Sequence, residues 1–471
     1  MNTFDQISQE IHTGKTNCQR ITEDYLKTIE SGRHYNAFLS VFSKQALESA
    51  RAIDKKLEVG KAGPLAGMVI SIKDAILVKG ERNSCASKML EEFVAPYDAT
   101  VVTRLQDADA IVIGKTNMDE FAMGSSTENS AFGRVRLAQD ETRVPGGSSG
   151  GSAVAVQAGM CTTALGSDTG GSIRQPAAFT GIVGLKPTYG RVSRYGLVAF
   201  ASSFDCIGPF ALTVKDTATV LSVIAGYDPK DSTSSTTPVP NYAEAFTGEV
   251  QDLRIGIPKE YFDESLNAEI REAIEKKIDI LKDRGAVVEE VSLPHTEYTI
   301  ATYYILATAE ASSNLARYDG ARYGFRAGGG KGIIDMYTKS RSGGFGDEVK
   351  RRIMLGTYIL SAGYYDAYYR KGQKVRRLIQ EDFLKVFTKV DCLITPTSPS
   401  TAFKAGEKSD DPLQMYLSDI YTTSANLAGI PGISIPCGVD RQGLPIGLQL
   451  LGKQFDESTL FRVADVLERS H

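Results

Sequence analysis

Short apolar runs alternate with helical segments along most of the chain, and this rhythm limits the fold more than any other feature. Residues 68–72 and 110–113 are apolar runs of strand length, and the segment from about 100 to 108 is typical of a helix. A strand, a helix and a second strand in this order form a unit with parallel strands, covered by helices on both faces. We therefore predict an α/β fold with a largely parallel sheet covered by helices on both faces.

The rhythm continues towards the C-terminus. The first sixty residues are predicted to be helical, with one helix beginning at Ser43. Glycines at 328–330 and 342–346 predict a mobile loop between them. Further strands are predicted at 163–166, 253–257, 286–291, 392–395, 433–435 and 446–451, and further helices at 152–158, 214–225, 268–284 and 457–470.

The composition is that of an ordinary globular protein. Of the 471 residues, 42% are apolar and 23% are charged, and the net charge is -4. A weakly acidic chain argues against a dominant phosphate-binding surface, so we expect any contact with nucleic acid to be narrow or made through a partner. The six cysteines lack the spacing of a zinc or redox pair, and the sequence shows neither a signal peptide nor a membrane-spanning run. We expect a cytoplasmic protein that does not contact a membrane.

Histidine is scarce, with four in the chain. None of them stands beside a cluster of glycine and serine, which lowers the odds of a Ser-His-Asp triad or a histidine-rich metal site. We expect no bound metal.

Two clusters of glycine and serine, at 146–152 and 168–172, stand out. Flexible linkers have such compositions, but both clusters lie between apolar segments, where a linker is not expected. The first cluster has the glycine spacing of a phosphate-binding loop, but Ser152 and Ala153 stand where that loop has Lys and Ser or Thr. Nucleotide binding is therefore weakly supported.

Catalysis is the remaining interpretation of these clusters. Glycines let backbone amides converge on one point, and those of Thr169, Gly170 and Gly171 could face an oxyanion beside the hydroxyl of Ser172. A serine nucleophile needs a base, and lysine is the natural candidate where histidine is scarce. Lys73 lies in the apolar run 69–78, where burial would lower its pKa towards neutrality. A salt bridge, for example with the neighbouring Asp74, is the competing interpretation, and the local sequence alone favours it.

Residues 69–78, 144–153 and 166–174 resemble, in order and spacing, the amidase signature family. The resemblance extends over nearly the whole chain and implies a large mixed, mostly parallel central sheet. It also implies one amidase domain over residues 1–471, with the helical segment 1–60 packed on it.

The same resemblance assigns catalytic roles. It implies that Ser172 is the nucleophile, that Ser148 is a bridging serine held at a cis peptide bond, and that Lys73 is the base. Ala75 departs from the family pattern, which usually has Asn at this position.

Other stretches resemble the A subunits of bacterial glutamyl-tRNA(Gln) amidotransferases. This resemblance implies that glutamine is the substrate and that its ammonia passes to a partner in a heterotrimer with subunits B and C. ATP and Mg²⁺ are expected at the partner, which would also bind the tRNA, and this chain is expected to bind no cofactor. The stretches that carry the resemblance are 119–133, 309–317, 345–357 and 361–369.

Glutamine carries a carboxylate and an ammonium group, so its pocket needs one cation and one anion. The resemblance assigns Arg352 to the α-carboxylate, Asp419 to the α-amino group and Tyr303 to a hydroxyl contact. Tyr304 is the alternative to Tyr303. By sequence alone, a solvated charge is the better interpretation of Arg352, and a residue on a helix surface is the better interpretation of Asp419.

Two other functions stay open at this stage. A free-standing amidase of the same family, acting on another small amide, would not need Arg352 and Asp419. A non-enzymatic scaffold would not need Ser172.

Overall fold

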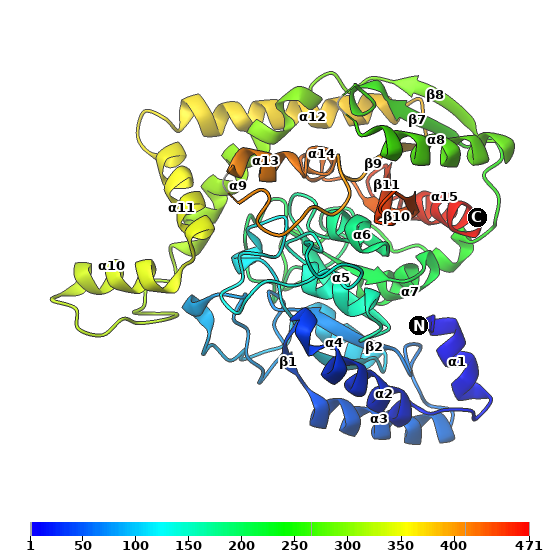
Figure 1. Cartoon of the computed structure of the whole chain (residues 1–471), viewed down its shortest axis with the longest axis horizontal. Helices are drawn as coiled ribbons and strands as arrows, with labels where there is room; N and C mark the ends of the chain where they lie inside the picture. The colour runs from blue at the N-terminus through cyan, green and yellow to red at the C-terminus, as the bar shows by residue number, and fades with distance from the viewer. Residues whose placement is uncertain (1, 265, 410, 471) are drawn as a thin grey trace.

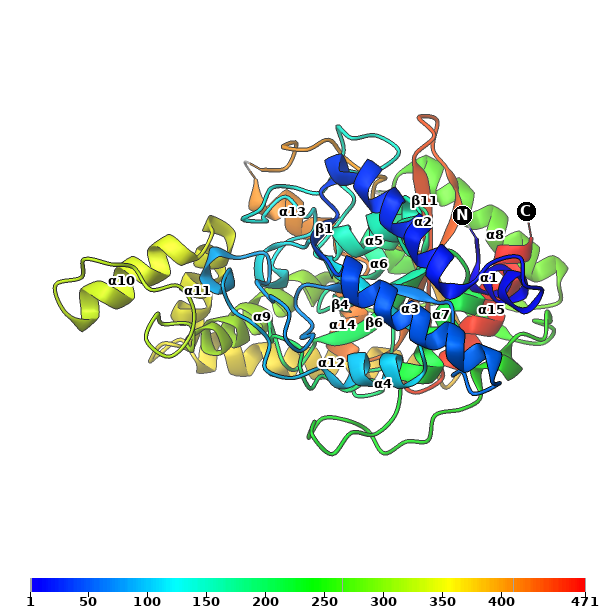
Figure 2. The ribbon, with the colours of Figure 1, turned by 90° about the horizontal axis from the view of Figure 1, so that it is seen from below.

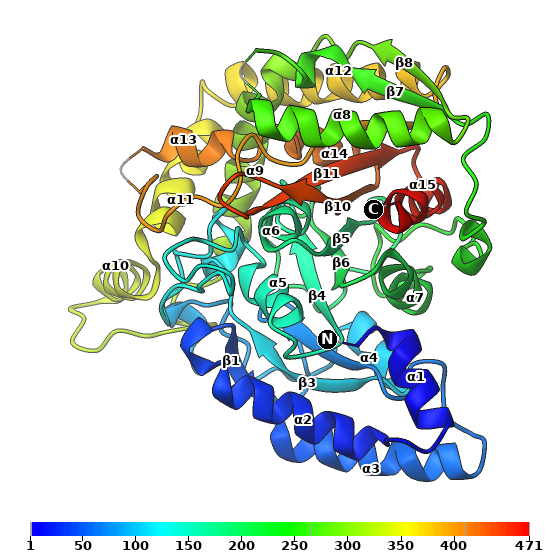
Figure 3. The same cartoon turned by 45° about the vertical axis from the view of Figure 1, so that its right-hand side comes forward.

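The computed structural model describes residues 2–264, 266–409 and 411–470. Within them, eleven strands form one sheet with the order β1-β3-β2-β4-β6-β5-β10-β11-β9-β7-β8. Figure 1 shows the whole chain, and Figure 3 shows the sheet running from β1 and β3 at the bottom to β7 and β8 at the top. The strands are β1 Phe38–Val41, β2 Val69–Lys73, β3 Ile111–Thr116, β4 Thr163–Asp168, β5 Val183–Lys186, β6 Cys206–Ala211, β7 Arg254–Pro258, β8 Val287–Val291, β9 Cys392–Pro396, β10 Gly432–Val439 and β11 Pro445–Gly452.

The sheet is mixed, as the family resemblance implies. Parallel pairs lie in two blocks, β3-β2-β4 near one edge and β9-β7-β8 at the other. The strands between these blocks, and the edge pair β1-β3, run antiparallel. The share of parallel pairing is therefore smaller than the β-α-β rhythm alone suggests, because neighbours such as β10 and β11 are joined by a tight turn instead of a helix.

Helices cover both faces of the sheet, as predicted. Every residue of β2, β4, β5, β6, β9 and β11 is buried, which requires cover on both sides. The helices are α1 Phe4–His12, α2 Cys18–Ser31, α3 Ser43–Glu58, α4 Thr100–Asp107, α5 Gly150–Gln157, α6 Arg174–Thr180, α7 Val214–Ile224, α8 Ala268–Asp283, α9 Thr299–Leu315, α10 Ile333–Gly344, α11 Asp347–Leu360, α12 Lys371–Val386, α13 Pro412–Leu417, α14 Thr423–Ala428 and α15 Glu457–Arg469.

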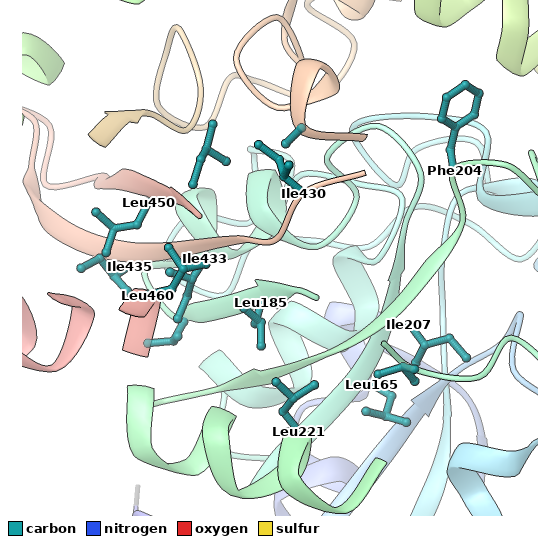
Figure 4. Packing of buried hydrophobic residues seen from close by; sticks show 14 of the residues in the cluster. Leu165, Leu185, Phe204, Ile207, Leu221, Ile430, Ile433, Ile435, Leu450 and Leu460 are labelled. Carbon is teal, nitrogen blue, oxygen red and sulfur yellow. The ribbon is translucent and has the colours of Figure 1, made fainter. Parts of the chain in front are cut away.

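Apolar side chains from strands far apart in the sequence form the main core. Figure 4 shows Leu165 of β4 and Ile207 of β6 beside Leu221 of α7, and Ile433 of β10 beside Leu460 of α15. Burying such side chains stabilises each by roughly 1.5–3 kcal/mol relative to exposure. The core therefore fixes the strand ends on which the glycine-rich turns begin.

The N-terminal segment packs on the sheet through apolar side chains, and it is not wholly helical. Cys18, Ala50 and Ile53, from α2 and α3, share an apolar cluster with residues of β3 and α5. Figure 2 shows α2 and α3 lying side by side. The correction is β1, which lies between these helices and pairs antiparallel with β3. Its four residues are too few to show a two-residue period in the sequence.

The glycine-bracketed segment also needs a correction. The predicted mobile loop contains α10, which projects from the body of the molecule together with the loop before it (Figures 1 and 2). The glycines mark the ends of this helix, since Gly332 is its N-cap residue and Gly344 its last residue. In the described part of the chain, no helix combines the length and the apolar character needed to cross a membrane.

Candidate active site

Lys73 ends strand β2 inside the sheet and is fully buried. Its Nζ donates to Ser148 Oγ at 2.6 Å and to Ser149 Oγ at 2.8 Å. The contact with Ser148 is the one that the sequence analysis expects. The contact with Ser149 was not predicted, and Ser149 in turn donates to the carbonyl oxygen of Ser167 at 3.1 Å.

The surroundings of Lys73 favour a neutral amine. Burial lowers its pKa to about 7, although the carboxylates of Asp119, Asp168 and Asp205 act in the opposite direction. The competing salt bridge with Asp74 does not form, because Asp74 pairs with Lys115, at 3.4 Å. Among the described residues, Lys73 has no ion-pair partner. An amine with a pKa near 7 can accept a proton at physiological pH.

The loop that carries Ser148 is held by its backbone. The Gly147–Ser148 peptide bond is cis, as the family resemblance implies. The carbonyl oxygen of Ser148 accepts a hydrogen bond from the backbone N–H of Asp119 at 3.1 Å, and the N–H of Gly147 donates to Gln175 Oε1 at 3.0 Å. A Cβ at position 147 would overlap the Asp119 carboxylate. These contacts explain why a glycine precedes the serine.

Ser172 lies in a turn organised by one carboxylate. The buried side chain of Asp168 accepts hydrogen bonds from the backbone N–H groups of Gly171 at 2.9 Å and Ile173 at 3.2 Å, and it pairs with the buried Arg174 at 3.1 Å. Ser172 is 9% exposed, whereas Lys73 and Ser148 are fully buried. Of the three predicted catalytic residues, Ser172 is thus the one that a substrate can reach.

Of the two hydrogen bonds that would link Lys73 to Ser148 and Ser148 to Ser172, only the first is present. Lys73 and Ser148 are hydrogen-bonded, but the Ser172 hydroxyl has no hydrogen-bond partner among the described residues. Catalytic hydrogen bonds are often long or misaligned without substrate and tighten when it binds. Since Lys73 also donates to the carbonyl oxygen of Ser167, at 3.4 Å, the turn that follows β4 lies beside the amine.

The three predicted oxyanion-hole amides differ. The backbone N–H of Gly171 already donates to Asp168, so its prediction as a free donor needs correction. The N–H groups of Thr169 and Gly170 have no partner in the part of the chain that the structure describes. The Thr169 side chain donates to Asp205 at 2.6 Å, and the Gly170 carbonyl accepts from Thr422 at 2.7 Å, so the turn is fixed from both sides.

Arg352 is buried on α11, not solvated. Its guanidinium lies over the rings of Phe200, Tyr304 and Tyr416, with its central carbon 5.3–5.6 Å from each centroid. Its Nε donates to Glu348 at 2.8 Å. Arginine stacked on aromatic rings keeps its charge and directs its remaining N–H groups.

Asp419 is also buried, at 7% exposure. Its Oδ2 accepts a hydrogen bond from the Ser125 hydroxyl, while its Oδ1 is buried without a partner in the described residues. Burial raises the pKa of Asp419 to about 7. An unpaired buried carboxylate oxygen is costly, and a bound cation would remove that cost.

Tyr303 and Tyr304 occupy different places on α9. A Cβ built on Gly170 would lie 2.5 Å from the Tyr303 hydroxyl, so this hydroxyl lies against the turn that carries the predicted oxyanion-hole amides. Tyr304 instead stacks on Tyr416, with centroids 3.9 Å apart, beside Arg352. The Tyr303 hydroxyl is therefore the one that lies near the predicted reacting groups. The Tyr304 ring belongs to the group of aromatic rings around Arg352.

A cavity of about 260 Å³ opens beside the buried arginine. Its lining includes Gly124, Ser126, Arg352 and Tyr416. The Ser126 hydroxyl is buried without a hydrogen-bond partner among the described residues. The lining is polar, but Ser172, Tyr303 and Asp419 are not part of it, so this cavity reaches only the arginine side of the predicted site.

The comparisons with known proteins show which family the chain belongs to. The family model described as Amidase matches residues 20–461. The chain belongs to the amidase family. Among the A subunits of glutamyl-tRNA(Gln) amidotransferases, it is 57% identical to that of Koribacter versatilis over 470 residues, which cover 99% of this chain and 98% of that protein.

Solved structures of the amidase family place the chain in the same fold. Among the glutamyl-tRNA(Gln) amidotransferase A subunits, the crystal structure of that from Thermotoga maritima matches with a TM-score of 0.80 and 44% identity, covering 96% of this chain and 92% of that one. The peptide amidase of Stenotrophomonas maltophilia matches with a TM-score of 0.82 and 30% identity, covering 99% and 96%. Family members with different substrates thus share this fold, and the substrate must be inferred from the pocket.

Sequence reasoning missed several residues that hold this amidase site together. Asp168 is the first residue of the second cluster, and its role in binding three backbone N–H groups could have been inferred from its place at the turn. Asp119 and Gln175 left no comparable local signal. No group of side chains suited to a metal ion occurs among the described residues.

Proposed function

We propose that this amidase is the glutaminase subunit of a tRNA-dependent amidotransferase. The observation that carries the proposal is a pair of buried opposite charges, Arg352 and Asp419, which lie close enough to interact electrostatically. Arg352 has N–H groups left to donate, and Asp419 has an unpaired oxygen among the described residues. Free glutamine has one carboxylate and one ammonium to satisfy them.

The two charges of glutamine are opposite in sign to those of Arg352 and Asp419. Arg352 binds the α-carboxylate, and Asp419 binds the α-ammonium through its free Oδ1. Each charge-assisted hydrogen bond of this sort contributes about 1.5–3 kcal/mol. The Tyr303 hydroxyl contacts the substrate nearer the side-chain amide. A simple aliphatic amide would leave the remaining N–H groups of Arg352 and the Oδ1 of Asp419 without partners among the described residues, although Arg352 would keep its ion pair with Glu348.

Catalysis proceeds through an acyl-enzyme. Neutral Lys73 accepts a proton from Ser148, and Ser148 accepts one from Ser172. At the same time, Ser172 Oγ attacks the carboxamide carbon. The N–H groups of Thr169 and Gly170 stabilise the oxyanion. The proton returns along the relay to the departing nitrogen, which leaves as ammonia.

Hydrolysis completes the cycle. A water molecule gives a proton to the relay and attacks the γ-glutamyl ester of Ser172. The ester bond breaks, the proton returns to Ser172 Oγ, and glutamate is released. Lys73 is again neutral, so the relay is ready for another molecule of glutamine.

The ammonia serves a partner. The relatives are named as A subunits, and we propose that this chain likewise acts in a cytoplasmic heterotrimer with subunits B and C. In that complex the partner uses ATP and Mg²⁺ to activate Glu-tRNA(Gln), binds the tRNA, and receives ammonia to form Gln-tRNA(Gln). This chain itself binds no cofactor.

Glutamine hydrolysis with and without the co-purifying subunits, ATP and Glu-tRNA(Gln) tests the proposal. We expect hydrolysis to increase when all three are added. Faster turnover of simple aliphatic amides than of glutamine, with no response to the partners, would favour a free-standing amidase. No turnover of any amide would favour a scaffold.

A further inference from the structure

Glu120 is a buried carboxylate that the reaction does not use. It lies in η3 (Glu120–Ala122), directly after Asp119, and is 3% exposed. Its Oε1 accepts a hydrogen bond from the Ser87 hydroxyl, and its Oε2 accepts one from the backbone N–H of Gly346 at 2.8 Å. A buried carboxyl group is costly unless its oxygens are hydrogen-bonded, so both donors stabilise it.

The partner Gly346 is the N-cap residue of α11. No side chain of α11 itself forms a cap hydrogen bond. In a capping box, a carboxylate of the helix itself accepts a hydrogen bond from the N-cap N–H. Here Glu120 has this role, although it lies far from α11 in the sequence. Its carboxyl group also lies at the positive end of the helix dipole, which favours the charged form, although burial raises the pKa of Glu120 to about 7. A Cβ on Gly346 would overlap Glu120 Oε2, so a glycine is needed at this contact.

Neighbouring contacts hold the whole junction between α10 and α11. The Ser87 hydroxyl also lies 3.2 Å from the carbonyl oxygen of Gly344, the last residue of α10. Phe345 packs edge-on against Phe121, with ring centroids 5.6 Å apart. In Figure 1, α11 lies between the projecting α10 and the body of the molecule. The junction 344–346 is therefore where α11 is fixed at its N-terminal end.

Arg352 follows Gly346 by six residues, which is about 9 Å along a helix. A displacement of the first turn of α11 is carried to this position, because a helix moves as a rigid rod over so short a distance. The hydrogen bond of Arg352 to Glu348 cannot oppose that movement, since both residues lie on α11. The rings of Phe200, Tyr304 and Tyr416 lie on other elements, so the movement shifts the guanidinium relative to them.

We propose that Glu120 is a positioning residue that sets the place of Arg352 and thereby the affinity for the α-carboxylate of glutamine. This inference rests on the proposed function of Arg352. Glu120 touches neither the substrate nor the reacting atoms, so it governs binding and leaves the chemical step unchanged.

Glu120→Gln tests the inference in the full chain, co-purified with its partner subunits. Glutamine keeps the size of the side chain but has one acceptor oxygen where the carboxylate has two. We expect the KM for glutamine to rise about tenfold, because a displaced Arg352 loses part of its hydrogen bonding to the α-carboxylate, while kcat stays within about twofold. A purely structural role would lower the amount of active enzyme, and so kcat, without changing KM.

Asp335→Asn is the matched control. Asp335 accepts a backbone N–H, from Lys331 at 2.8 Å, near the N-terminus of the neighbouring helix α10. The same charge is removed, but α11 keeps its anchor, so KM should stay within about twofold of wild type. An unchanged KM in Glu120→Gln, or an equal rise in both variants, would overturn the inference.

Ser87→Ala provides a second route if Glu120→Gln does not fold, as judged by its thermal melt. It leaves the carboxylate in place but removes one of its donors, and we expect a KM increase of about threefold. An unchanged KM there would contradict the inference. Absence of glutamine hydrolysis by the wild-type complex, measured first, would instead overturn the proposed function and the inference with it.

Discussion

The groups proposed for catalysis and the groups proposed for substrate binding are held by different kinds of structure. Lys73 ends a buried strand, and Ser148 and Ser172 lie on glycine-rich turns whose backbone is fixed by Asp119 and Asp168. Arg352 and Asp419 lie far along the chain, and the arginine is held by aromatic rings and by the anchor of one helix. Hydrogen bonds to the backbone hold the residues proposed for catalysis, whereas side-chain packing holds the residues proposed to select the substrate.

This difference separates what mutations should do. Changes in the turns should reduce the rate of the chemical step, because proton transfer depends on the 2.6 Å hydrogen bond between Lys73 and Ser148 and on the place of Ser172 beside it. Changes among the helices should raise KM and leave kcat nearly intact. A family member could then exchange its substrate by changing the helices without disturbing the turns.

Ser172→Ala should have the largest effect. Losing the nucleophile is expected to lower kcat for glutamine by about 10⁴-fold or more, with little change in KM. Single-turnover and steady-state assays of ammonia release measure this. The control Ser222→Ala, which changes an exposed serine on α7, should retain wild-type activity. Substantial turnover by Ser172→Ala would remove the assigned nucleophile.

Lys73→Met comes next, with an expected fall in kcat on the order of 10³-fold. In the wild type, kcat should rise with pH through about 7, because the neutral amine is the active form and the pKa of Lys73 is about 7. The pH profile of kcat is the informative one, since Asp419, whose pKa is also about 7, is paired with substrate at saturation. A flat profile between about pH 6 and 8 would argue against Lys73 as the base, provided that chemistry limits turnover.

Arg352→Met should raise the KM for glutamine about 100-fold, with a much smaller change in kcat. The variant loses charge-assisted hydrogen bonds and leaves the α-carboxylate unpaired. Steady-state kinetics measure both constants. Arg351→Met, which removes an exposed neighbour paired with the same Glu348, is the control and should change KM less than about threefold. Equal losses in the two variants would contradict the assignment.

Tyr303→Phe should have the smallest effect of the four, a rise in KM of about fivefold from one neutral hydrogen bond. Tyr304→Phe should change KM less than about twofold, because its ring, not its hydroxyl, contacts Arg352. The two variants are compared in the same assay. The reverse order would give the substrate contact to Tyr304.

The sequence predicts the turns much better than the helices, for a physical reason. A lysine in an apolar strand and glycines beside serines are unusual in their local setting, so Lys73 and Ser172 can be recognised there. Arg352 lies in the run Lys350-Arg-Arg352, and only the tertiary fold buries the third of these cations. The resemblance to a family, not the local pattern, identified it.

The fold shows a similar contrast. Long periodic segments such as 268–284 were predicted to within a residue. Strands β5 and β6 were missed because their four and six residues contain glycine, proline and lysine, which hide the apolar pattern. The hydrogen bond from the Gly171 N–H to Asp168 depends on the three-dimensional shape of the turn, so the spacing of residues in the sequence could not predict it.

Trapping the acyl-enzyme tests the central claim most directly. The full chain with its co-purified subunits is mixed with glutamine, quenched in acid within one turnover, digested and analysed by mass spectrometry. The account predicts a γ-glutamyl ester on Ser172 that is absent from Ser172→Ala and that disappears as glutamate forms. An ester on another residue, or hydrolysis of glutamine by Ser172→Ala at the wild-type rate, would contradict it.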